Sequence, residues 1–507
     1  MSRVAGRSQL RAGSLVSYAT VALDAVAGLI YTPWMVSAIG GSNYGLYTLA
    51  LSLVNLFLLD FGLGSAVSKY LSEYYAKGRY DEANRFLGAA YKLYALVAAA
   101  VCVVLVGAYF LIGVIYTKLT PAELMTFKVL YAIVATYSVL SFPFLSFSGI
   151  LLSNERFVAL KSCAFLQKLS TILLIVGALY FGGGVYSLVA VNAGVGIVFI
   201  LVRYAIIRGI PHVRPVSPGG RTVGFRGILG FSGWVTVAQI AQRLIFNVTP
   251  TILGAVSGSH AIAVFGLASS LEGYVFVVSE ALNGLFLPKV SRIVSQDGSQ
   301  DGLLDLMVRV GRLQTYILGL IVLGFVCFGY RFVLTWMGSD YTLVYYCTVI
   351  LMLPALIDLP QQIGRTAVLA TNNVRAQAHV YVAMVFLNVV LTIGLARLFG
   401  VVGACISICI AYAARTFGMN LIYRRALAVD VGAFFRRTYG SWLVPAGLSL
   451  GFGGLLEIVL AVPGWTGIAL KAAAFSLVYM FLMHRMAFDA QERALLVEIV
   501  PLPWRAG

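Results

Sequence analysis

The sequence predicts an all-α polytopic membrane protein with about fourteen transmembrane helices, in two pseudo-symmetric six-helix lobes around a central cavity plus two C-terminal helices. Three observations lead to this fold class. The 507-residue chain is 60% hydrophobic and only 11% charged, which is more apolar surface than one soluble core could hide. Apolar stretches of roughly twenty residues recur along its whole length. A pattern in the first half of the chain returns in the second half.

The apolar stretches follow one another with short connections. They lie approximately at 14–39, 44–68, 90–115, 124–152, 163–182, 184–207, 228–257, 260–288, 312–337, 343–370, 378–399, 401–423, 439–461 and 464–484. The run that follows MSRVAGRSQLRAG is too long for the apolar region of a signal peptide and lacks a clear small-residue cleavage site. It therefore predicts a retained first span.

Basic residues mark one side of the membrane. The net charge is +17, and Lys and Arg gather before span one and after the even-numbered spans, at 3–11, 69–92, 203–226, 289–312, 424–437 and 485–505. Intervening loops such as GGSNYG, SGSHA and VPGWTG are nearly free of Lys and Arg. This positive-inside distribution predicts cytoplasmic termini and an even number of spans. It argues against a nucleic-acid partner and favours contact of the basic loops with anionic lipid headgroups.

Catalytic and metal-binding patterns are weak. The four histidines are scattered, and none has a second ligand at metal spacing. The six cysteines fall mostly inside apolar spans, where a small buried hydrophobe is the ordinary role. The chain has no Walker-type lysine motif. We therefore expect no catalytic residue, no metal and no cofactor, and we interpret the chain as a transporter rather than an enzyme.

The strongest internal signal is a repeat. YTPWMVSAIGG at 31–41 is echoed by VTPTILGAVSG at 248–258, and the same offset of about 217 residues places Pro143 on Pro360. With a slightly different offset, residues 58–78 around span two align with residues 277–298 around span eight. The chain is then predicted to consist of four parts. They are an N-lobe at 1–210 with spans one to six, a basic cytoplasmic connection at 211–227, a C-lobe at 228–425 with spans seven to twelve, and two extra spans with a cytoplasmic tail at 426–507.

Halves of six spans enter the membrane with the same orientation, related by an axis along the membrane normal. Transporters built from such repeats place the substrate at the interface between the repeats and alternate access by rocking one lobe against the other. Prolines inside spans, such as Pro33 and Pro250, supply the bends that such rocking needs.

Residues 40–86, GGSNYGLYTLALSLVNLFLLDFGLGSAVSKYLSEYYAKGRYDEANRF, resemble the opening of polysaccharide-type (Wzx-like) flippases of the multidrug/oligosaccharidyl-lipid/polysaccharide (MOP) exporter superfamily. SGILLSNERF after span four and the twofold repeat fit the same family, so the resemblance covers roughly the whole chain. It implies two lobes around a cavity lined mainly by spans one, two, seven and eight. It also implies movement of a polyprenyl-pyrophosphate-linked oligosaccharide from the inner to the outer leaflet of the cell membrane, with other polysaccharide-assembly proteins as partners.

Ionisable and polar residues gather on these four spans. On span seven Gln239, Arg243 and Asn247 recur at helical spacing and form one polar stripe, which we predict to bind substrate. A second set is assigned to coupling or to the lobe interface. It comprises Asp24 in span one, Asp60 in span two, and Glu272 and Glu280 in span eight.

Arg243 has two competing explanations. A guanidinium at mid-membrane depth costs at least ~3 kcal/mol, so it needs a partner, a water-filled cavity or an anionic ligand. Arg243 either forms a lobe-to-lobe salt bridge with Asp24 or Glu272, or coordinates the pyrophosphate of the carrier lipid, whose oxygens suit its forked donors. An ion pair that opens to admit phosphate would combine both roles.

Other charged residues lie outside these assignments. For Asp358 a helix-packing or proton-coupling role is equally open. We interpret Arg365 and Arg415, which lie outside the four cavity spans, as structural.

Three alternative functions remain open. A cation-coupled drug or metabolite antiporter of the same superfamily would want an acidic N-lobe, which Asp24 and Asp60 could supply. A lipid II flippase fits the number of spans, although its more basic first-span cavity is not obvious here. A membrane-embedded polysaccharide enzyme would need a sizeable extracytoplasmic loop with paired catalytic residues, and the short outer loops speak against it.

Overall fold

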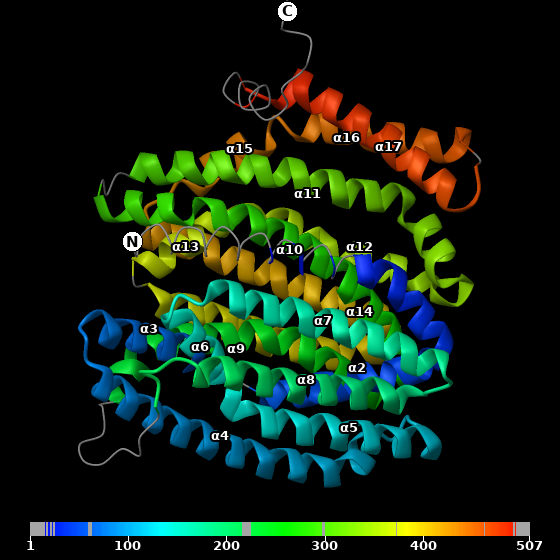
Figure 1. Ribbon diagram of the computed structural model, residues 1–507. Helices are drawn as coiled ribbons and strands as arrows, with labels where there is room; N and C mark the ends of the chain where they lie inside the picture. Colours follow the sequence, from blue (N-terminus) through cyan, green and yellow to red (C-terminus); the bar gives the residue numbers. More distant parts are fainter. Residues whose placement is uncertain are drawn as a thin grey trace, which may run out of the picture. The chain divides into compact units, whose positions relative to one another are not determined.

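The computed structural model describes residues 26–58, 63–214, 225–296, 300–371, 373–460 and 462–489, and in addition Val16, Ala19, Thr20, Leu23 and Glu492. Every regular element in these ranges is helical, and none is a strand (Figure 1). The prediction of an all-α protein is therefore confirmed.

The elements of the first half begin with a helix over Val26–Ile39. They continue with α2 (Gly41–Phe57), α3 (Leu63–Ala76), α4 (Tyr80–Ile115), α5 (Pro121–Ser141), η1 (Phe142–Leu145), α6 (Ser146–Ser153), α7 (Phe157–Tyr180) and α8 (Val185–Arg208). The second half contains α9 (Phe225–Val256), α10 (Ser259–Gln296), α11 (Gln300–Met337), η2 (Ser339–Tyr341), α12 (Thr342–Asp358), η3 (Leu359–Gln361), α13 (Gln362–Ala370) and α14 (Val374–Ala426). The chain closes with α15 (Val431–Tyr439), α16 (Leu443–Val459), α17 (Gly464–Leu482) and η4 (Met483–Ala487).

Within the described ranges, nine helices are long and apolar enough to cross a membrane, or ten if the bent pair α15 and α16 is one span. The predicted number of about fourteen spans is not confirmed. Three features account for much of the difference. The helix α2 has only 17 residues, the polar side chains of α9 lower its mean hydropathy, and α14 counts once although it runs for 53 residues. A straight helix of that length would be roughly 80 Å long, far more than a bilayer needs.

Backbone breaks recur at the repeat offset. Pro143 lies in η1 between α5 and α6, and Pro360 lies in η3 between α12 and α13. Proline has no backbone N–H and weakens an α-helix, and at these two positions a short 3₁₀ turn separates two helices, whereas Pro250 and Pro354 remain inside α9 and α12. Gly400, with φ 59°, interrupts α14 between the two spans predicted there. The structure thus repeats the helix breaks as well as the helices.

The chain divides into two compact units. Unit 1 comprises Met1–Gly266 and Val385–Ala404, and unit 2 comprises Leu267–Met384 and Cys405–Gly507. In unit 1, α2 packs against both α5 and α9, and α7 packs against α8. A buried apolar cluster centred on Leu71, Phe86 and Phe147 joins α3, α4 and α6.

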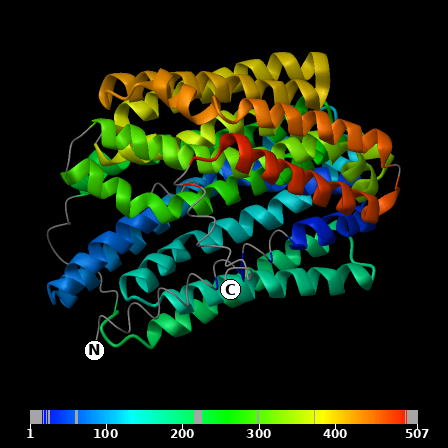
Figure 2. The same cartoon turned by 90° about the horizontal axis from the view of Figure 1, so that it is seen from above.

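In unit 2 the C-terminal pair α16 and α17 lie side by side and both contact α11 (Figures 1 and 2). Gly319 of α11 makes room for Trp442 and Tyr479, because a Cβ at this position would come within 2.7 Å of the Tyr479 hydroxyl. Glu457 of α16 accepts hydrogen bonds from Lys471 of α17 at 2.6 Å and from Arg331 of α11 at 3.0 Å. These contacts attach the extra helices to α11.

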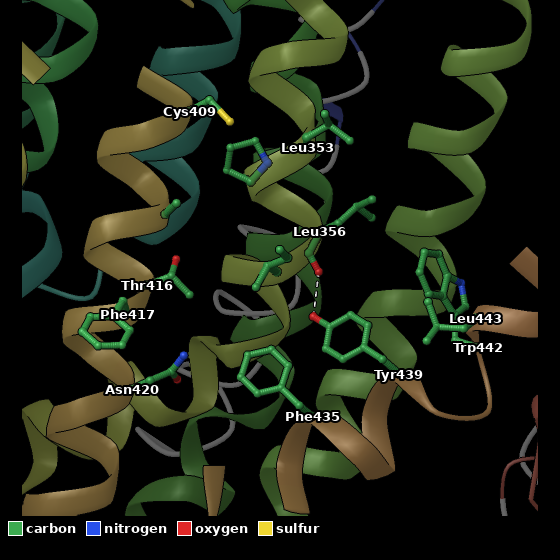
Figure 3. Close-up of a pocket in the computed structure, with 13 residues that line it drawn as sticks. Leu353, Leu356, Cys409, Thr416, Phe417, Asn420, Phe435, Tyr439, Trp442 and Leu443 are labelled. Carbon is green, nitrogen blue, oxygen red and sulfur yellow. Dashed lines mark hydrogen bonds between the residues drawn. The ribbon is translucent and has the colours of Figure 1, made fainter. Parts of the chain in front are cut away.

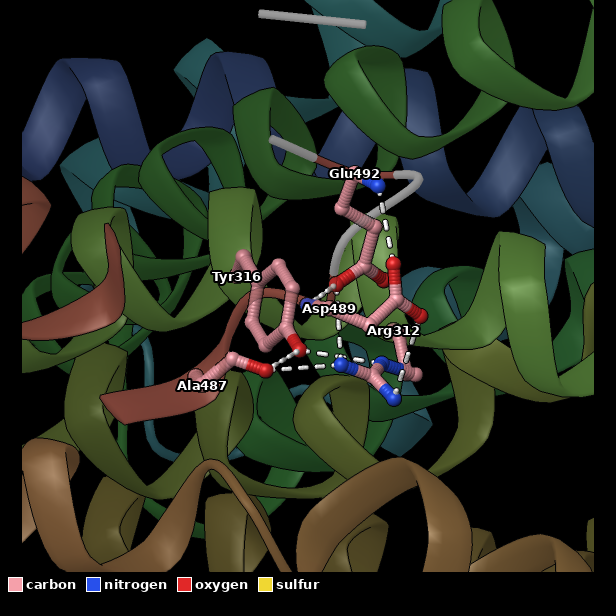
Figure 4. A network of polar contacts seen from close by, with 5 residues as sticks. All are labelled: Arg312, Tyr316, Ala487, Asp489 and Glu492. Carbon is pink, nitrogen blue, oxygen red and sulfur yellow. Dashed lines mark hydrogen bonds and ion pairs between the residues drawn. The ribbon is translucent and has the colours of Figure 1, made fainter. Parts of the chain in front are cut away.

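A second polar network attaches the segment after α17 to the same helix (Figure 4). Arg312 of α11 donates to the carbonyl of Ala487 at 2.7 Å, to Glu492 at 2.8 Å and, through Nε, to the hydroxyl of Tyr316 at 3.0 Å. Asp489 lies 3.7 Å from the same guanidinium. Glu492 is largely buried, and burial raises the pKa of its carboxyl. The segment is therefore held by a compact arrangement of charges together with the ring contact of Phe488 on Tyr316.

Candidate functional site

The predicted substrate stripe lies on the less buried face of α9. Gln239 and Arg243 are exposed and Asn247 is half-buried, whereas Ala241 and Ile245 on the packed face are buried. The Asn247 amide donates to the backbone carbonyl of Arg243 at 2.8 Å. The spacing of four residues thus keeps the three polar groups together on one side of the helix.

The guanidinium of Arg243 makes no ion pair with any described residue of unit 1. Its predicted partner Asp24 and the coupling residue Asp60 both lie outside the described residues. Its other predicted partner, Glu272, belongs to unit 2. Both pairings therefore stay predictions.

The two acidic residues predicted on span eight have different surroundings. Glu272 of α10 is 4% exposed, whereas Glu280, two turns further along, is exposed. The charge on Glu272 interacts with that of Arg415 on α14. Cys405, also on α14, interacts both with Glu272 and with Cys347 of α12. Glu272 therefore lies where α10, α12 and α14 converge.

Asp358 connects these helices through two arginines. It is the last residue of α12, and its Oδ2 accepts from Arg365 of α13 at 2.9 Å and from Arg415 of α14. The Asp358 and Arg415 side chains are 5% and 0% exposed. Arg415 also packs against aromatic rings, with its guanidinium carbon 4.1 Å from the centroid of Tyr412 and 5.4 Å from that of Tyr381.

The cluster of Glu272, Asp358, Arg365 and Arg415 holds two acids and two bases. Breaking such a buried pair leaves an uncompensated charge, so each member depends on the others. Sequence reasoning identified each residue but not the cluster, because Asp358 and Arg415 are 57 residues apart in the chain. The structural interpretation of Arg365 and Arg415 agrees with these contacts.

Unit 2 also contains an apolar groove of about 700 Å³ (Figure 3). Its lining comes from α12, α14, α15 and α16 and comprises Leu353, Pro354, Leu356, Ile357, Cys409, Ala413, Thr416, Phe417, Asn420, Phe435, Tyr439, Trp442 and Leu443. The hydroxyl of Tyr439 donates to the carbonyl of Leu356 at 2.7 Å, so it is already satisfied. The groove therefore offers mainly hydrocarbon to an occupant.

In unit 1 the starts of α2, α5 and α10 meet at one end. Ser259 donates to Glu123 at 2.5 Å, and Thr120 caps α5 through the same carboxylate. Gly45 of α2 lies so close to the backbone carbonyl of Ser259 that a Cβ there would clash with it. The three loops at this end are those predicted to be extracytoplasmic. Sequence reasoning assigned no role to Glu123, although the T-x-x-E capping pattern marks it as the start of a helix.

No group of three or more potential metal ligands occurs among the residues that the structure describes. The arrangement offers arginines, a hydroxyl and amide stripe, and an apolar groove. These groups can bind an anion and a hydrocarbon chain.

Comparison with protein families gives one match. The family described as "Polysaccharide biosynthesis protein" matches residues 10–286. A search of curated proteins found no match.

Solved structures share the fold over most of the chain. "Lipid II flippase MurJ, inward closed conformation" has a TM-score of 0.72 and 14% identity, covering 96% of this chain and 99% of that one. The "eukaryotic MATE transporter AtDTX14" has a TM-score of 0.58 and 15% identity over 82% of this chain and 96% of its own. A "MOP superfamily transporter from Pyrococcus furiosus" has a TM-score of 0.55 and 11% identity over 83% and 95%. The chain is thus a multi-pass membrane protein with the fold of MOP superfamily transporters.

Proposed function

This chain belongs to the polysaccharide biosynthesis protein family, and from that premise we propose that it is a flippase for a lipid-linked sugar. Its substrate would be a polyprenyl-pyrophosphate-linked oligosaccharide, the repeat unit of a surface polysaccharide. The protein would move this molecule from the inner to the outer leaflet of the cell membrane by alternating access. Both termini would be cytoplasmic.

The observation that carries the proposal is the polar stripe of α9. Arg243 is exposed in a predicted span, next to Gln239 and Asn247, and pairs with no carboxylate among the described residues of unit 1. A guanidinium presents paired donors that match phosphate oxygens, and the amides can bind the remaining oxygens or a sugar hydroxyl. A pyrophosphate would thus supply the counter-charge that Arg243 needs.

The apolar groove of unit 2 supports a lipid substrate. Burying hydrocarbon between Phe417, Phe435 and Leu443 suits a prenyl chain better than a sugar. A flippase has to guide such a chain while its polar head crosses the membrane. The groove would bind the prenyl chain on the protein surface while the head group moves.

The end of unit 1 near Ser259 supports alternating access. Its contact brings Gly45 against the carbonyl of Ser259 and joins the Ser259 hydroxyl to the Glu123 carboxylate. Small polar contacts of this kind allow helices to approach closely and separate again. We propose that this end closes the extracytoplasmic side.

Labelling tests the topology. A cysteine at His260, which is exposed beside the buried Ser259, should react with an impermeant maleimide in intact cells, or in spheroplasts if there is an outer membrane. A cysteine at Ser217 in the basic connection should not. The reverse labelling would place the termini outside.

Transport itself is tested by reconstitution. Proteoliposomes that contain the protein and a labelled polyprenyl-linked oligosaccharide should exchange the label between leaflets faster than protein-free vesicles with the same lipid. The exchange is measured as a change in the fraction of label that an external reagent can reach. Arg243→Ala should remove this acceleration at equal protein content. Equal rates with and without the intact protein would reject the flippase.

A lipid II flippase is the second candidate, because the MurJ structure covers the two C-terminal spans as well as both halves. Supplying lipid II in the same assay separates the two substrates. Antiport of a small cation-coupled solute is the third candidate, suggested by the likeness to MATE transporters. Transport of a soluble solute that requires a proton or sodium gradient would favour the antiporter.

A further inference from the structure

The acidic residues of the chain are unevenly distributed. None occurs between Glu155 and Glu272, a stretch that contains α7, α8 and α9. The same stretch holds nine basic residues, which are Arg156, Lys161, Lys168, Arg203, Arg208, Arg214, Arg221, Arg226 and Arg243. The helices α7, α8 and α9 therefore contain no acidic residue of their own.

Arg203 is the most enclosed of these cations for which contacts are defined. It is half-buried on α8, and its Nη2 donates to Oε1 of Gln167 on α7 at 2.7 Å. Its Nε is buried and has no hydrogen-bond acceptor. Its charge acts on Tyr137 and Cys163, both of which are neutral side chains at neutral pH. Within unit 1, no described carboxylate forms an ion pair with Arg203.

Three arginines inside predicted spans of unit 2, in contrast, have carboxylate partners. Arg365 and Arg415 both bind Asp358, and Arg312 binds Glu492. A charged side chain inside a membrane protein needs an opposite charge, water or a polar ligand. Among the described residues of unit 1, Arg203 receives only the neutral amide of Gln167, so an anion from outside the chain can serve as its remaining partner.

The depth of Arg203 indicates which anion. Arg203 lies five residues before the end of α8 at Arg208, which corresponds to roughly 7.5 Å along the helix axis. That end leads into the basic connection predicted to be cytoplasmic. The backbone of Arg203 therefore lies near the level where lipid phosphates of the inner leaflet meet the hydrocarbon, and its side chain reaches Gln167, ten residues after the start of α7 at Phe157.

We propose that Arg203 and Gln167 form a lipid-phosphate site between α7 and α8. Gln167 orients the guanidinium through Nη2, and the Nη nitrogens bind the phosphate oxygens. Lys161 and Lys168, which are exposed two turns apart on α7, add positive charge to the same helix. Resting on the proposed function, the site receives the pyrophosphate of the carrier lipid at the inner leaflet before it reaches Arg243.

The experiment measures lipid binding without transport. The purified full-length chain in phosphatidylcholine nanodiscs is titrated with radiolabelled polyprenyl pyrophosphate that carries no sugar. Arg203→Gln should weaken binding by about tenfold, because one bidentate charged contact is lost. Arg203→Lys should recover part of the affinity, since it keeps the charge and loses the fork. The matched control Arg208→Gln, at the exposed end of the same helix, should stay within about twofold.

A second arm identifies the source of the phosphate. Phosphatidylglycerol is added as a competitor, and its own enrichment around the protein is measured. The carrier is supported as the ligand if Arg203→Gln loses polyprenyl pyrophosphate binding and phosphatidylglycerol does not compete for that binding in the native chain. Loss of phosphatidylglycerol enrichment alone supports the phosphate site but assigns it to ordinary phospholipid and overturns the carrier assignment.

Unchanged binding of both lipids in a folded, monodisperse Arg203→Gln protein overturns the proposal. Gln167→Leu provides a second variant that keeps the charge and removes only the orienting amide, and it should weaken pyrophosphate binding by several-fold. Unchanged lipid binding in Arg203→Gln would leave the flippase proposal intact as long as the native protein transports the glycan. Binding at Arg203 without glycan transport would reject the flippase instead.

Discussion

Asp358, Arg365 and Arg415 of unit 2 correspond, at the repeat offset of about 217 residues, to Ser141, Ser148 and Val198 in the first half. The two serines donate to carbonyls of their own turns, at 3.0 Å to Ser138 and 2.8 Å to Leu145. The helices and the break after α5 form without any charge there. The ion pairs are thus not required for this arrangement of helices, and their presence in only one copy indicates a task particular to unit 2.

The reverse difference holds for Arg203. Its counterpart is Asn420, which lines the apolar groove of unit 2. The position that lines an apolar groove in the second half is therefore occupied by an arginine in the first half. In unit 2 Arg312, Arg365 and Arg415 bind carboxylates, whereas no described carboxylate of unit 1 pairs with Arg203 or Arg243, the two arginines that we propose to bind phosphate. This difference suggests that one copy handles the prenyl chain and the other the phosphates.

The largest effect is expected from Asp358→Asn. Removing this carboxylate takes away the acid that both Arg365 and Arg415 bind, and breaking a buried pair of this kind costs about 3–5 kcal/mol. Thermal unfolding in detergent should show a strongly lowered midpoint or little folded protein. A midpoint equal to that of the native chain would mean that the cluster does not stabilise unit 2.

Arg243→Ala should come next. If Arg243 binds pyrophosphate, loss of a charged bidentate contact of about 2–3 kcal/mol should lower transport by roughly 30- to 150-fold while the protein stays in the membrane. Arg243→Lys should restore part of the rate. If Arg243 only pairs with Asp24, the double change Asp24→Asn with Arg243→Gln should restore transport that each single change impairs.

Gly45→Ala should disturb the closed end of unit 1. The added Cβ would clash with the carbonyl of Ser259, and such overpacking costs about 1–3 kcal/mol. A cysteine at His260 should then label faster with an impermeant maleimide. Gly177→Ala is the control, because a Cβ there meets nothing within 4 Å. Equal acceleration in both variants would show that the contact at Gly45 has no special role.

Ala413→Trp should fill the apolar groove. Ala413 lines it and is exposed, so the larger ring displaces a bound chain without disturbing a buried core. Transport of a substrate with a long prenyl chain should fall by about fivefold, equivalent to about 1 kcal/mol, and a short-chain analogue should be less affected. Ala414→Trp changes an exposed neighbour outside the groove and should have little effect.

The smallest effect is expected from Ser141→Ala, the counterpart of the first change. The serine hydroxyl bonds only to its own turn, so its loss should cost less than about 1 kcal/mol. Comparing its unfolding midpoint with that of Asp358→Asn measures how much more unit 2 depends on this position than unit 1 does.

Several features of the fold could be predicted from single segments. Pro143 and Pro360 end their helices in both halves because proline lacks an N–H wherever it stands. The stripe of Gln239, Arg243 and Asn247 follows from the helical period alone. The number of spans was less predictable, since Gly400 interrupts one continuous run of helical residues and the polar side chains of α9 obscure a span.

The candidate site depended on more distant relationships. Nothing in the spacing of Asp358 and Arg415, 57 residues apart, indicates that they bind each other. The same is true of Gln167 and Arg203, 36 residues apart, and of Glu123 and Ser259, 136 residues apart. The absence of acids between Glu155 and Glu272 was visible in the sequence, but its meaning required knowing which helices are neighbours.

The sequence by itself determined that this protein is an all-helical membrane protein built from a repeat, because the length of apolar runs and the chemistry of proline and glycine act locally. Only the tertiary structure decided which of the described charges pair with one another within the protein. Charge pairing acts over a few ångströms in a medium of low dielectric constant. The partners are therefore chosen by the packing of helices that lie far apart in the chain.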